Sequence, residues 1–357
     1  MSSVFVSAWV GAGNLGDELL FRRLLDLLRV GGADEVTVVS LDPVATESLH
    51  GVTAVHPRAL HRVVTALRRA DLVIVGPGGL LQDASSPFNL PYQLHRAILA
   101  RALNVPVLGM GLGADPMHRR GSGTLLRLGL GSASTIAVRD EPSRRALAAH
   151  GVVATTTADL AVATMTVEAT EDPSSTLVVS LRPWRNGGRV PVRWQRHALH
   201  EAQIAATATA IDQIVADTDL AVRFVAFEPH TDHPLHEAVA ARLATPSTCL
   251  VPSLDELVAV VADSAAVVAT RYHAAVVGLI AQRPVTAIGY APKVQAIAAE
   301  LEGTVSLVAD DAEGLASLPT AVTAAMGVDA NVRQTDVAGL RRREAENAAL
   351  VAQALAG

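Results

Sequence analysis

The chain has 357 residues, too many for one ordinary core and suited to two domains of roughly 100–200 residues each. Half of the residues are hydrophobic and 18% are charged, which excludes an intrinsically disordered chain. The net charge is −6 and aromatic residues make up 3%. The composition therefore lacks both the positive charge and the stacking aromatics of a nucleic-acid-binding protein, and we expect no nucleic acid partner.

Short β-branched segments alternate with helical periodicity over the first half of the chain, the pattern of βαβ units around a parallel sheet. The expected strands are residues 4–10, 35–41, 72–75, 105–110 and 135–138. The expected helices are residues 18–30, 59–70, 92–103 and 141–150. This alternation predicts a Rossmann-like domain over residues 1–165.

An acidic stretch with Pro173 and two serines, residues 166–175, interrupts the alternation and is interpreted as a linker. A second Rossmann-like domain is expected over residues 176–330. Its expected strands are residues 177–181, 222–227, 249–251, 267–270, 285–288 and 305–308. Residues 331–357 are expected to form a C-terminal helix, with the charged run 341–346 on a solvated face. The predicted fold class is α/β, with two Rossmann-like domains facing a cleft.

Cys249 is the only cysteine, so the chain can form no intrachain disulfide, which fits a reducing cytoplasm. Its apolar flank predicts a strand and a buried, unreactive thiol. The amino terminus has no basic region, and no apolar run reaches the ~18–20 residues that a membrane span requires. We therefore expect a cytoplasmic protein.

The first of three glycine-rich segments, residues 11–18, follows a strand and matches G-x-G-x-x-G. Asp42 ends the next strand, where a dinucleotide-binding protein holds a ribose. The pattern leaves a nicotinamide cofactor, a plain tight turn and a polar loop facing a ligand open. Asn14 and Asp17 favour the polar loop, because an aspartate repels a pyrophosphate.

Two further glycine-rich segments, residues 76–83 and 109–114, also follow expected strands of the first domain. Glycines at a strand end let the backbone bend close to a bound molecule. One such segment is weak evidence, whereas three at successive strand ends predict a rim that faces a ligand.

Arg139 ends the last expected strand of the first domain, just before the helix that begins near Pro142. An arginine in that position can hold a carboxylate or a phosphate through two parallel hydrogen bonds. The alternative is an ion pair with Asp140 or Glu141. The residues alone leave both interpretations open.

Polar residues also follow two successive strands of the second domain. Thr270 is expected to cap a helix, which puts Arg271 and His273 in its first turn, where free N–H groups favour an anion. Cations are disfavoured there unless they face an anion, so the pattern indicates a ligand site, with capping or packing as the alternative for His273. Tyr290 and Lys293 follow the next strand, and a solvated lysine is the alternative there.

Histidines at three-residue spacing, His230, His233 and His236, lie near Asp232 and suggest a metal site. Pro234 is expected to interrupt the segment, and no fourth ligand is evident, so we expect no metal. A serine hydrolase is not expected either, because the chain has no G-x-S-x-G elbow.

With these residues in view, the chain resembles the polysaccharide pyruvyl transferase family from about residue 8 to about residue 300. The matching segments are GNLGDELL (13–20), DLVIVGPGGLLQD (71–83), GMGLGA (109–114), VRDEPS (138–143), TADLAV (157–162), VVSLRPW (178–184), FEP with Asp232, TRYHA (270–274) and IGYAPKV (288–294). The arginine-x-histidine-alanine element, followed by tyrosine-x-proline-lysine, is the most specific. The family has aspartate before that proline, where this chain has Ala291.

The resemblance implies a GT-B-like fold and the transfer of pyruvyl from phosphoenolpyruvate to two hydroxyls of a sugar, forming a cyclic ketal. On this likeness Arg139, His273 and Lys293 align with the family's donor-site and catalytic residues. The reaction needs cations for the donor's two anionic groups and an acid to protonate its methylene carbon. We assign His273 as the acid or acid/base. Arg139, Arg271 and Lys293 are the expected anion clamps. Tyr290 is a further expected donor contact.

The glycine-rich rim of the first domain is expected to face the sugar acceptor. The expected acceptor-binding residues are Asn14, Asp17, Gly78, Gly79 and Gln82. The acceptor is expected to belong to a cell-surface glycan or its precursor, a lipid-linked form at the inner membrane face included. No cofactor and no metal are expected, because phosphoenolpyruvate is the donor and the reaction has no redox step.

Three alternatives stay open at this point. A GT-B glycosyltransferase using a nucleotide sugar is one, since Arg and Lys also hold diphosphates. A NAD-dependent oxidoreductase built on the first glycine-rich segment is another. The third is a non-catalytic sugar-binding relative, against which the intact Arg139, His273 and Lys293 argue.

Overall fold

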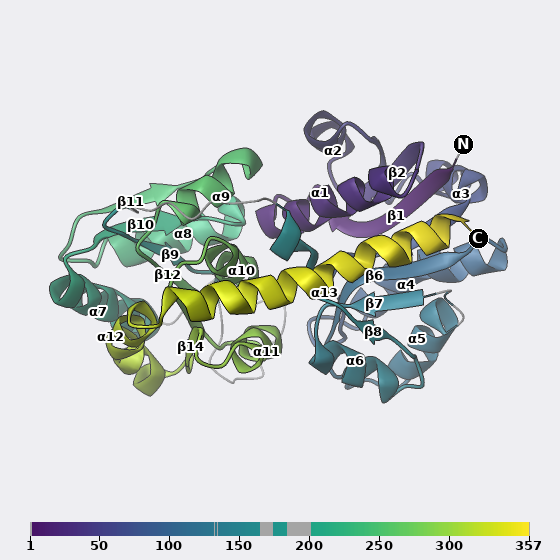
Figure 1. Ribbon diagram of the computed structural model, residues 1–357. Helices are drawn as coiled ribbons and strands as arrows, with labels where there is room; N and C mark the ends of the chain where they lie inside the picture. The colour runs from purple at the N-terminus through teal and green to yellow at the C-terminus, as the bar shows by residue number, and fades with distance from the viewer. Residues whose placement is uncertain (1, 132, 134, 165–173, 184–200, 357) are drawn as a thin grey trace. The chain divides into compact units, whose positions relative to one another are not determined.

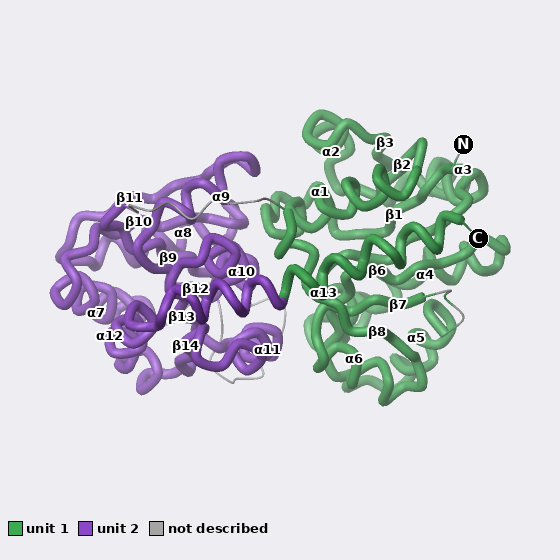
Figure 2. Tube along the Cα trace, in the orientation of Figure 1, with its two compact units in different colours: residues 1–164, 340–357 green, residues 165–339 purple. Residues whose placement is uncertain are grey.

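The structure, a computed structural model, describes residues 2–131, 133, 135–164, 174–183 and 201–356. Two compact units make up the chain (Figure 2): unit 1 comprises residues 1–164 and 340–357, and unit 2 comprises residues 165–339. The expected linker, residues 166–175, lies outside the described residues except for its last two. Within the described ranges, no helix is both long enough and apolar enough to cross a membrane.

Unit 1 is built around a parallel sheet (Figure 1). Its strands are β1 (Ser3–Val10), β2 (Glu35–Ser40), β3 (Thr53–Val55), β4 (Leu72–Val75), β5 (Gly78–Leu81), β6 (Val107–Ala114), β7 (Thr135–Val138) and β8 (Thr155–Thr156). Its helices are α1 (Leu15–Val30), α2 (Pro43–His50), α3 (Leu60–Arg69), α4 (Asn89–Ala102), α5 (Ser122–Leu130), α6 (Glu141–Ala148) and the 3₁₀-helix η1 (Leu160–Ala163). The strand order is β3-β2-β1-β4-β6-β7-β8, with β5 beside β6.

Apolar periodicity explains how these elements pack. β4 is buried along its whole length, as expected of a central parallel strand covered by helices on both faces. α1 repeats buried leucines at four-residue spacing, Leu20, Leu24 and Leu28, which places them on one helix face. The core of unit 1 thus forms from consecutive βαβ units.

Unit 2 repeats the plan with its own parallel sheet and core. Its strands are β9 (Thr176–Ser180), β10 (Ala221–Val225), β11 (Ser247–Leu250), β12 (Ala266–Ala269), β13 (Val285–Ile288) and β14 (Val305–Val308). Its helices are α7 (Glu201–Thr218), α8 (Pro229–Ala240), α9 (Leu254–Ala262), α10 (Tyr272–Ile280), α11 (Pro292–Glu300) and α12 (Ala312–Met326). The strand order is β11-β10-β9-β12-β13-β14.

One row of backbone partners crosses the four inner strands of this second sheet. Phe224 of β10 pairs with Val179 of β9, Val179 pairs with Val268 of β12, and Val268 pairs with Thr286 of β13. Because the strands are parallel, the chain leaves all four at the same edge of the sheet. The segments that leave them are residues 226–232, 181–183, 270–274 and 289–293.

The structure corrects the expectation that the glycine-rich residues 76–83 and 109–114 follow strands, because most of them are strand residues themselves. β5 and β6 include most of them, and Gly78 pairs with Leu112 across the two strands. The register of β6 against β7 shifts between Gly109 and Leu112, and Gly111 between them has φ +58°. Small residues let the sheet bend there without breaking its hydrogen bonding. The two segments therefore form strands at the rim of the sheet.

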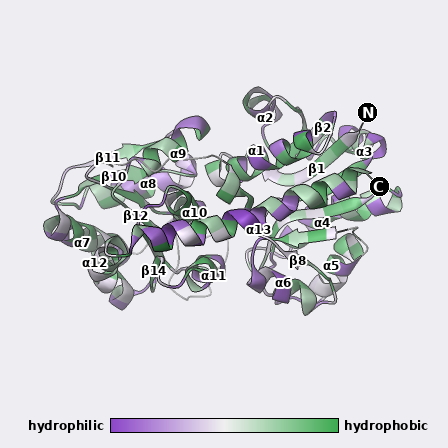
Figure 3. Ribbon diagram, viewed as in Figure 1, coloured by the Kyte–Doolittle hydropathy of each residue, from purple (hydrophilic) through white to green (hydrophobic). Residues whose placement is uncertain are grey.

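The C-terminal helix α13 spans Ala330–Ala356, and its residues from 340 onward belong to unit 1. Figure 3 colours the middle of α13 as hydrophilic. The expected solvated face is nonetheless wrong at Glu344, which is 1% exposed and accepts hydrogen bonds of 2.9 and 3.0 Å from Arg23 of α1. A charged residue can be buried here because the Arg23 guanidinium pairs with it.

Cys249 lies on β11, an edge strand of the unit 2 sheet. An edge strand has a neighbour on one side only, so its side chains stay partly accessible, and the expectation of a buried thiol is wrong. Partial burial and the nearby Glu237 carboxylate raise the pKa of the Cys249 thiol. At neutral pH the thiol is therefore protonated and a poor nucleophile.

Candidate active site

Arg139 lies in unit 1 directly after β7, and its guanidinium is buried between carboxylates. Its Nε donates to Asp140 Oδ2 at 3.1 Å, and its Nη1 lies 3.6 Å from Asp159 Oδ2. Asp140 also caps α6, and Asp159 caps η1. The ion pair with Asp140, which the sequence left open as an alternative, is therefore present. The donor contact expected of Arg139 stays a prediction.

The guanidinium of Arg139 lies against the glycine-rich rim. A Cβ on Gly113 would lie 2.8 Å from Arg139 Cζ, whereas a Cβ on Gly79 would lie 3.9 Å from Arg139 Nη2. The first distance is a clash and the second is an ordinary contact. We therefore expect Gly113→Ala to displace the buried guanidinium and to lower the free energy of unfolding by about 1–3 kcal/mol.

Gly79→Ala is the matched control, because it adds the same methyl group beside the same guanidinium. Urea denaturation of both variants makes the comparison. Equal stability of Gly113→Ala and the parent protein would show that Arg139 has room to move, against the packing described here.

The expected acceptor residues have different surroundings. Asn14 caps α1, and its side-chain oxygen accepts a backbone N–H at 3.0 Å. Asp17, in the first turn of α1, lies beside Gly78, whose Cβ would be 3.4 Å from Asp17 Oδ1. Gln82 follows β5 and bonds Ser85 through its side chain. The structure thus brings Asp17 to the rim, while Asn14 and Gln82 carry local structural bonds.

The first glycine-rich segment forms a tight turn against β2. Gly11 has φ +72°, and a Cβ there would lie 2.1 Å from Ser40 Oγ. Asp42, the residue considered for a ribose, caps α2 by accepting the Ala45 N–H at 3.1 Å. Both features have structural explanations, so the dinucleotide pattern has no further support from the structure.

In unit 2, Arg271 is the most strongly paired of the expected site residues. It is itself the N-cap residue of α10, which corrects the assignment of Thr270 as the cap. Its Nε donates to Asp232 Oδ2 at 2.9 Å, and its Nη2 donates to Glu228 Oε2 at 2.7 Å. Thr231 accepts from the same Nη2 at 2.8 Å. The segment after β10 is thereby fixed to the segment after β12.

Asp232 is fully buried and holds this cluster together. Its Oδ2 accepts the backbone N–H groups of Phe227 at 3.1 Å and of Glu228 at 2.9 Å, besides the Arg271 bonds. Burial lowers the pKa of the Arg271 guanidinium, but the Asp232 and Glu228 carboxylates raise it, and the pKa ends above its usual value. Arg271 thus stays charged, and the Asp232 and Glu228 carboxylates balance its charge. Its contact with the donor remains a prediction.

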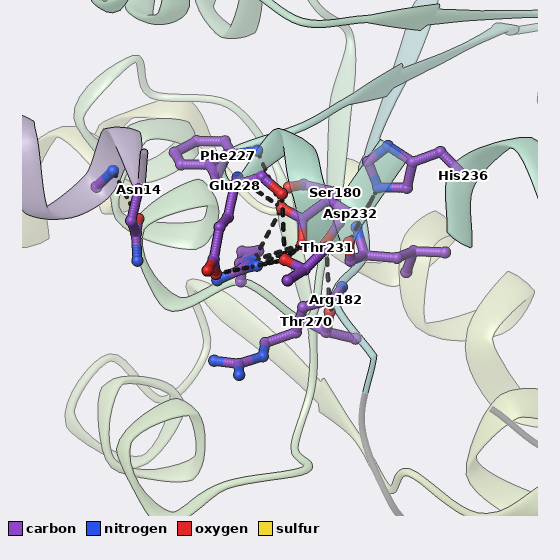
Figure 4. Close-up of polar contacts among 12 residues, drawn as sticks. Asn14, Ser180, Arg182, Phe227, Glu228, Thr231, Asp232, His236 and Thr270 are labelled. Atoms are coloured by element: carbon purple, nitrogen blue, oxygen red, sulfur yellow. Dashed lines mark hydrogen bonds and ion pairs between the residues drawn. The ribbon is translucent and has the colours of Figure 1, made fainter. Parts of the chain in front are cut away.

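Arg182 is a cation that the sequence interpretation did not assign to the site. Its backbone N–H donates to Thr270 Oγ1 at 2.7 Å, and its guanidinium carbon lies 5.4 Å from the centre of the Tyr290 ring. Figure 4 shows Arg182 beside Thr270. Its position just after β9, in the motif VVSLRPW, was the available signal. The stacking joins the ends of β9 and β13 and gives the expected donor residue Tyr290 a partner.

His273 and Lys293 each lie in the first turn of a helix that has no side-chain cap. The N-cap residues of α10 and α11, Arg271 and Ala291, make no capping bond, whereas Ser253 caps α9. The dipole of each helix therefore favours an anion beside each expected functional side chain, and both side chains are partly buried. The result is a pair of anion-favouring helix starts at neighbouring strand ends.

The three histidines of α8 do not form a metal site. The helix continues through Pro234, so the expected interruption is wrong, because the buried Leu235 packs that turn onto the sheet despite the cost of a proline. His230 is exposed, His233 lies 3.6 Å from a carboxylate of Glu237, and His236 is buried. Across the described ranges, no group of three or more His, Cys, Asp or Glu side chains is arranged to hold a metal ion.

His236 makes the stability of unit 2 depend on pH. Its Nε2 accepts the Leu181 N–H at 3.0 Å, and burial lowers its pKa from 6.5 to about 4. Unfolded chains bind the proton below pH 6.5 while the folded protein excludes it until about pH 4, so the free energy of unfolding falls across that interval. The shift corresponds to roughly 3 kcal/mol at the acid end.

Urea unfolding of the parent protein and of His236→Gln across the same interval tests this expectation. The stability difference between the two proteins should shrink as the pH falls, because glutamine binds no proton. A difference that stays constant with pH would show that His236 does not titrate in this way.

Comparisons with known proteins add a family and a fold. The sequence profile of the polysaccharide pyruvyl transferase family matches residues 14–292. No match was found among curated proteins. The chain resembles a glycosyltransferase from Rickettsia africae (12% identity, TM-score 0.61, 99% of this chain and 98% of that one). It also resembles the MnaA–UDP structure from S. aureus (12%, 0.59, 94% and 94%).

A third solved structure is the UDP-GlcNAc 2-epimerase from Neisseria meningitidis bound to UDP-GlcNAc (11% identity, TM-score 0.57, 96% of this chain and 100% of that one). At such low identity these likenesses show the fold alone. They confirm the predicted α/β class and its GT-B-like type, with parallel sheets in both units.

Proposed function

The chain belongs to the polysaccharide pyruvyl transferase family, and from that premise we propose that it transfers a pyruvyl group from phosphoenolpyruvate to two hydroxyls of a sugar. The sugar belongs to a cell-surface glycan or its precursor. The observation that carries this proposal within the structure is the edge of the unit 2 sheet. There Arg182, His273 and Lys293 lie at the ends of adjacent strands, beside two uncapped helix starts.

Phosphoenolpyruvate has a phosphate and a carboxylate, and such an edge suits it. A phosphate or carboxylate is stabilised by backbone N–H groups at a helix start and by a nearby cation. α10 and α11 supply the helix starts, Lys293 supplies a cation, and Arg182 supplies a second one over Tyr290. Arg271 holds the edge together through Asp232 and Glu228, and a direct donor contact of Arg271 is part of the proposal.

The proposed reaction balances without an oxidant, a reductant or a metal. One acceptor hydroxyl adds to C2 of phosphoenolpyruvate as an acid delivers a proton to C3, which becomes a methyl group. The proton that this hydroxyl loses replaces the proton that the acid gave. The second hydroxyl then forms the other C2–O bond as the C2–O bond to phosphate breaks, and its proton leaves with the phosphate. His273 is the proposed proton donor, since imidazole titrates near neutral pH.

Unit 1 is the proposed acceptor unit, with a lipid-linked sugar at the inner membrane face as one form of acceptor. The rim around Asp17, Gly78 and Gly79 is part of that unit, and Arg139 lies against the same rim. We place the reaction in the cytoplasm and infer that no cofactor takes part in it.

A nucleotide-sugar glycosyltransferase is the second candidate. Two of the similar structures are complexes with UDP or UDP-GlcNAc, and the fold is shared. The same arginines and lysine suit a diphosphate as well as phosphoenolpyruvate. The two candidates differ in the donor consumed and in the group added to the acceptor.

The test incubates the protein with a panel of synthetic and lipid-linked sugars and either phosphoenolpyruvate or a UDP-sugar. The proposal expects acceptor-dependent phosphate release and an acceptor mass raised by a pyruvate ketal. His273→Ala is the control for a contaminating activity and should lose nearly all of both signals. UDP release with glycosyl addition would instead establish the second candidate.

A further inference from the structure

Unit 1 contains a pocket separate from the residues expected to bind the acceptor. Its volume is ≈ 660 Å³, within the range typical of small-molecule sites. The chain has three Trp, three Tyr and five Phe, and one of each, Trp9, Tyr92 and Phe88, lines this pocket. The Trp9 and Tyr92 rings meet edge-on at 6.2 Å, and Phe88 is 77% exposed. The chain has few aromatic residues, so the presence of three at one pocket indicates a surface shaped to bind a ligand.

A buried cation lines the same pocket. Arg96 of α4 is 1% exposed, and its guanidinium carbon lies 4.8 Å from the centre of the Tyr92 ring. Its Nη1 donates to Ser7 Oγ at 3.2 Å, but its Nε and Nη2 have no hydrogen-bond partner among the described residues. Leaving such groups unpaired in a protein interior is costly. An anion bound in the pocket would accept hydrogen bonds from Arg96 Nε and Nη2.

The charged residues that line the pocket also indicate an anionic ligand. Arg58 and Arg96 line it, together with His56 and His95, and none of its lining residues is Asp or Glu. The whole chain nevertheless has more acidic than basic residues. Burial and the nearby positive charge of Arg96 lower the pKa of His95, which keeps that ring neutral at pH 7. Among the described residues that line the pocket, the only formal charges are positive, so the pocket favours a negative ligand.

We propose that this pocket binds a sugar that carries an anionic group, either a carboxylate or a phosphate. The Trp9 and Tyr92 rings provide the apolar surface for the sugar ring, Asn89 provides a polar contact for hydroxyls, and Arg96 binds the anion through Nε and Nη2. The identification of this sugar with the acceptor rests on the proposed pyruvyl transfer. The pocket then defines the acceptor class as an acidic or phosphorylated sugar.

The test is calorimetric titration of the full chain, without phosphoenolpyruvate, with four probes. These are a glucuronic acid glycoside, a hexosamine 1-phosphate, the neutral parent sugar and inorganic phosphate. At least one anionic sugar should bind more tightly than both the neutral sugar and inorganic phosphate. Inorganic phosphate binding as tightly as the sugar phosphate, or the neutral sugar as tightly as both anionic ones, would overturn the proposal.

Arg96→Met removes the charge while keeping a long apolar side chain. Its affinity for the anionic sugar should fall roughly 10–100-fold, as expected when a charge-assisted contact is lost. The free variant should be as stable as the parent protein or more stable, because an unpaired buried charge has gone. Arg68→Met, an exposed change in α3, should alter neither property. Unchanged binding in Arg96→Met would overturn the proposal.

A second variant separates the pocket from the donor chemistry. Trp9→Ala should weaken binding of the same anionic sugar while leaving phosphoenolpyruvate binding unchanged. Loss of binding of both ligands would overturn the assignment. If the sugars bind as expected but no phosphate is released from phosphoenolpyruvate, then the binding site stands and the proposed pyruvyl transfer fails. The two claims can therefore fail independently.

Discussion

Replacing His273 by alanine is expected to lower kcat by ~100-fold or more, while the affinity for phosphoenolpyruvate changes much less. A proton donor acts mainly in the transition state, whereas an anion clamp acts on the bound donor and the transition state alike. His273 lies in the first turn of α10, where an uncapped helix start accompanies it. Steady-state kinetics beside calorimetric titration of the donor measures both quantities.

Lys293→Ala should show the opposite pattern. Loss of its charge should weaken phosphoenolpyruvate binding by roughly 10–150-fold, the range for a charge-assisted contact. His61→Ala, an exposed histidine of α3, is the control and should change neither kcat nor donor affinity. If His273→Ala abolishes donor binding while turnover at saturation survives, His273 is a donor contact. Glu228 and His230 are then the next candidates for the acid.

Asp232→Asn is expected to destabilise unit 2 by roughly 3–5 kcal/mol, because it leaves the buried Arg271 without its main counter-charge. Asp232 is 0% exposed and also accepts two backbone N–H groups at the end of β10. The amide keeps the size of the carboxylate, so the loss reports on charge and hydrogen bonding. Urea denaturation at neutral pH measures it.

Glu237→Gln is the matched control on the same helix, since its side chain is exposed and lies 3.6 Å from His233. It should change the free energy of unfolding far less. The double variant Asp232→Asn/Arg271→Met should recover part of the lost stability, because no buried cation is then left unbalanced. No recovery in the double variant would contradict this account of the cluster.

The parallel strands could be predicted because each is a short apolar run with its own local pattern. The expected strands 72–75, 135–138, 285–288 and 305–308 match β4, β7, β13 and β14 to the residue. β5 and the far half of β6 were missed, since their glycines carry no pattern of alternation. Their strand character comes from pairing between segments about thirty residues apart, which no local window contains.

The candidate site divides in the same way. His273, Lys293 and Tyr290 could be placed because residues following parallel strands share one edge of a sheet. Asp140 was one of the two partners considered for Arg139, but Asp232 and Asp159 could not be predicted as partners, since they lie in other segments of the chain. The burial of Arg96 could not be predicted for another reason: an arginine within a helix is ordinarily solvent-exposed. Only its packing against Ser7 and Tyr92 shows that it is buried.

The most direct test of the central claim is the product formed in heavy water from phosphoenolpyruvate and the acceptor that supports phosphate release. Mass spectrometry and NMR of the product identify the added group and the origin of its methyl hydrogens. Our account predicts a pyruvate ketal whose methyl group carries one solvent-derived deuterium, with one phosphate released for each ketal formed. An acceptor that stays unmodified with phosphoenolpyruvate but gains a glycosyl group from a UDP-sugar would contradict it.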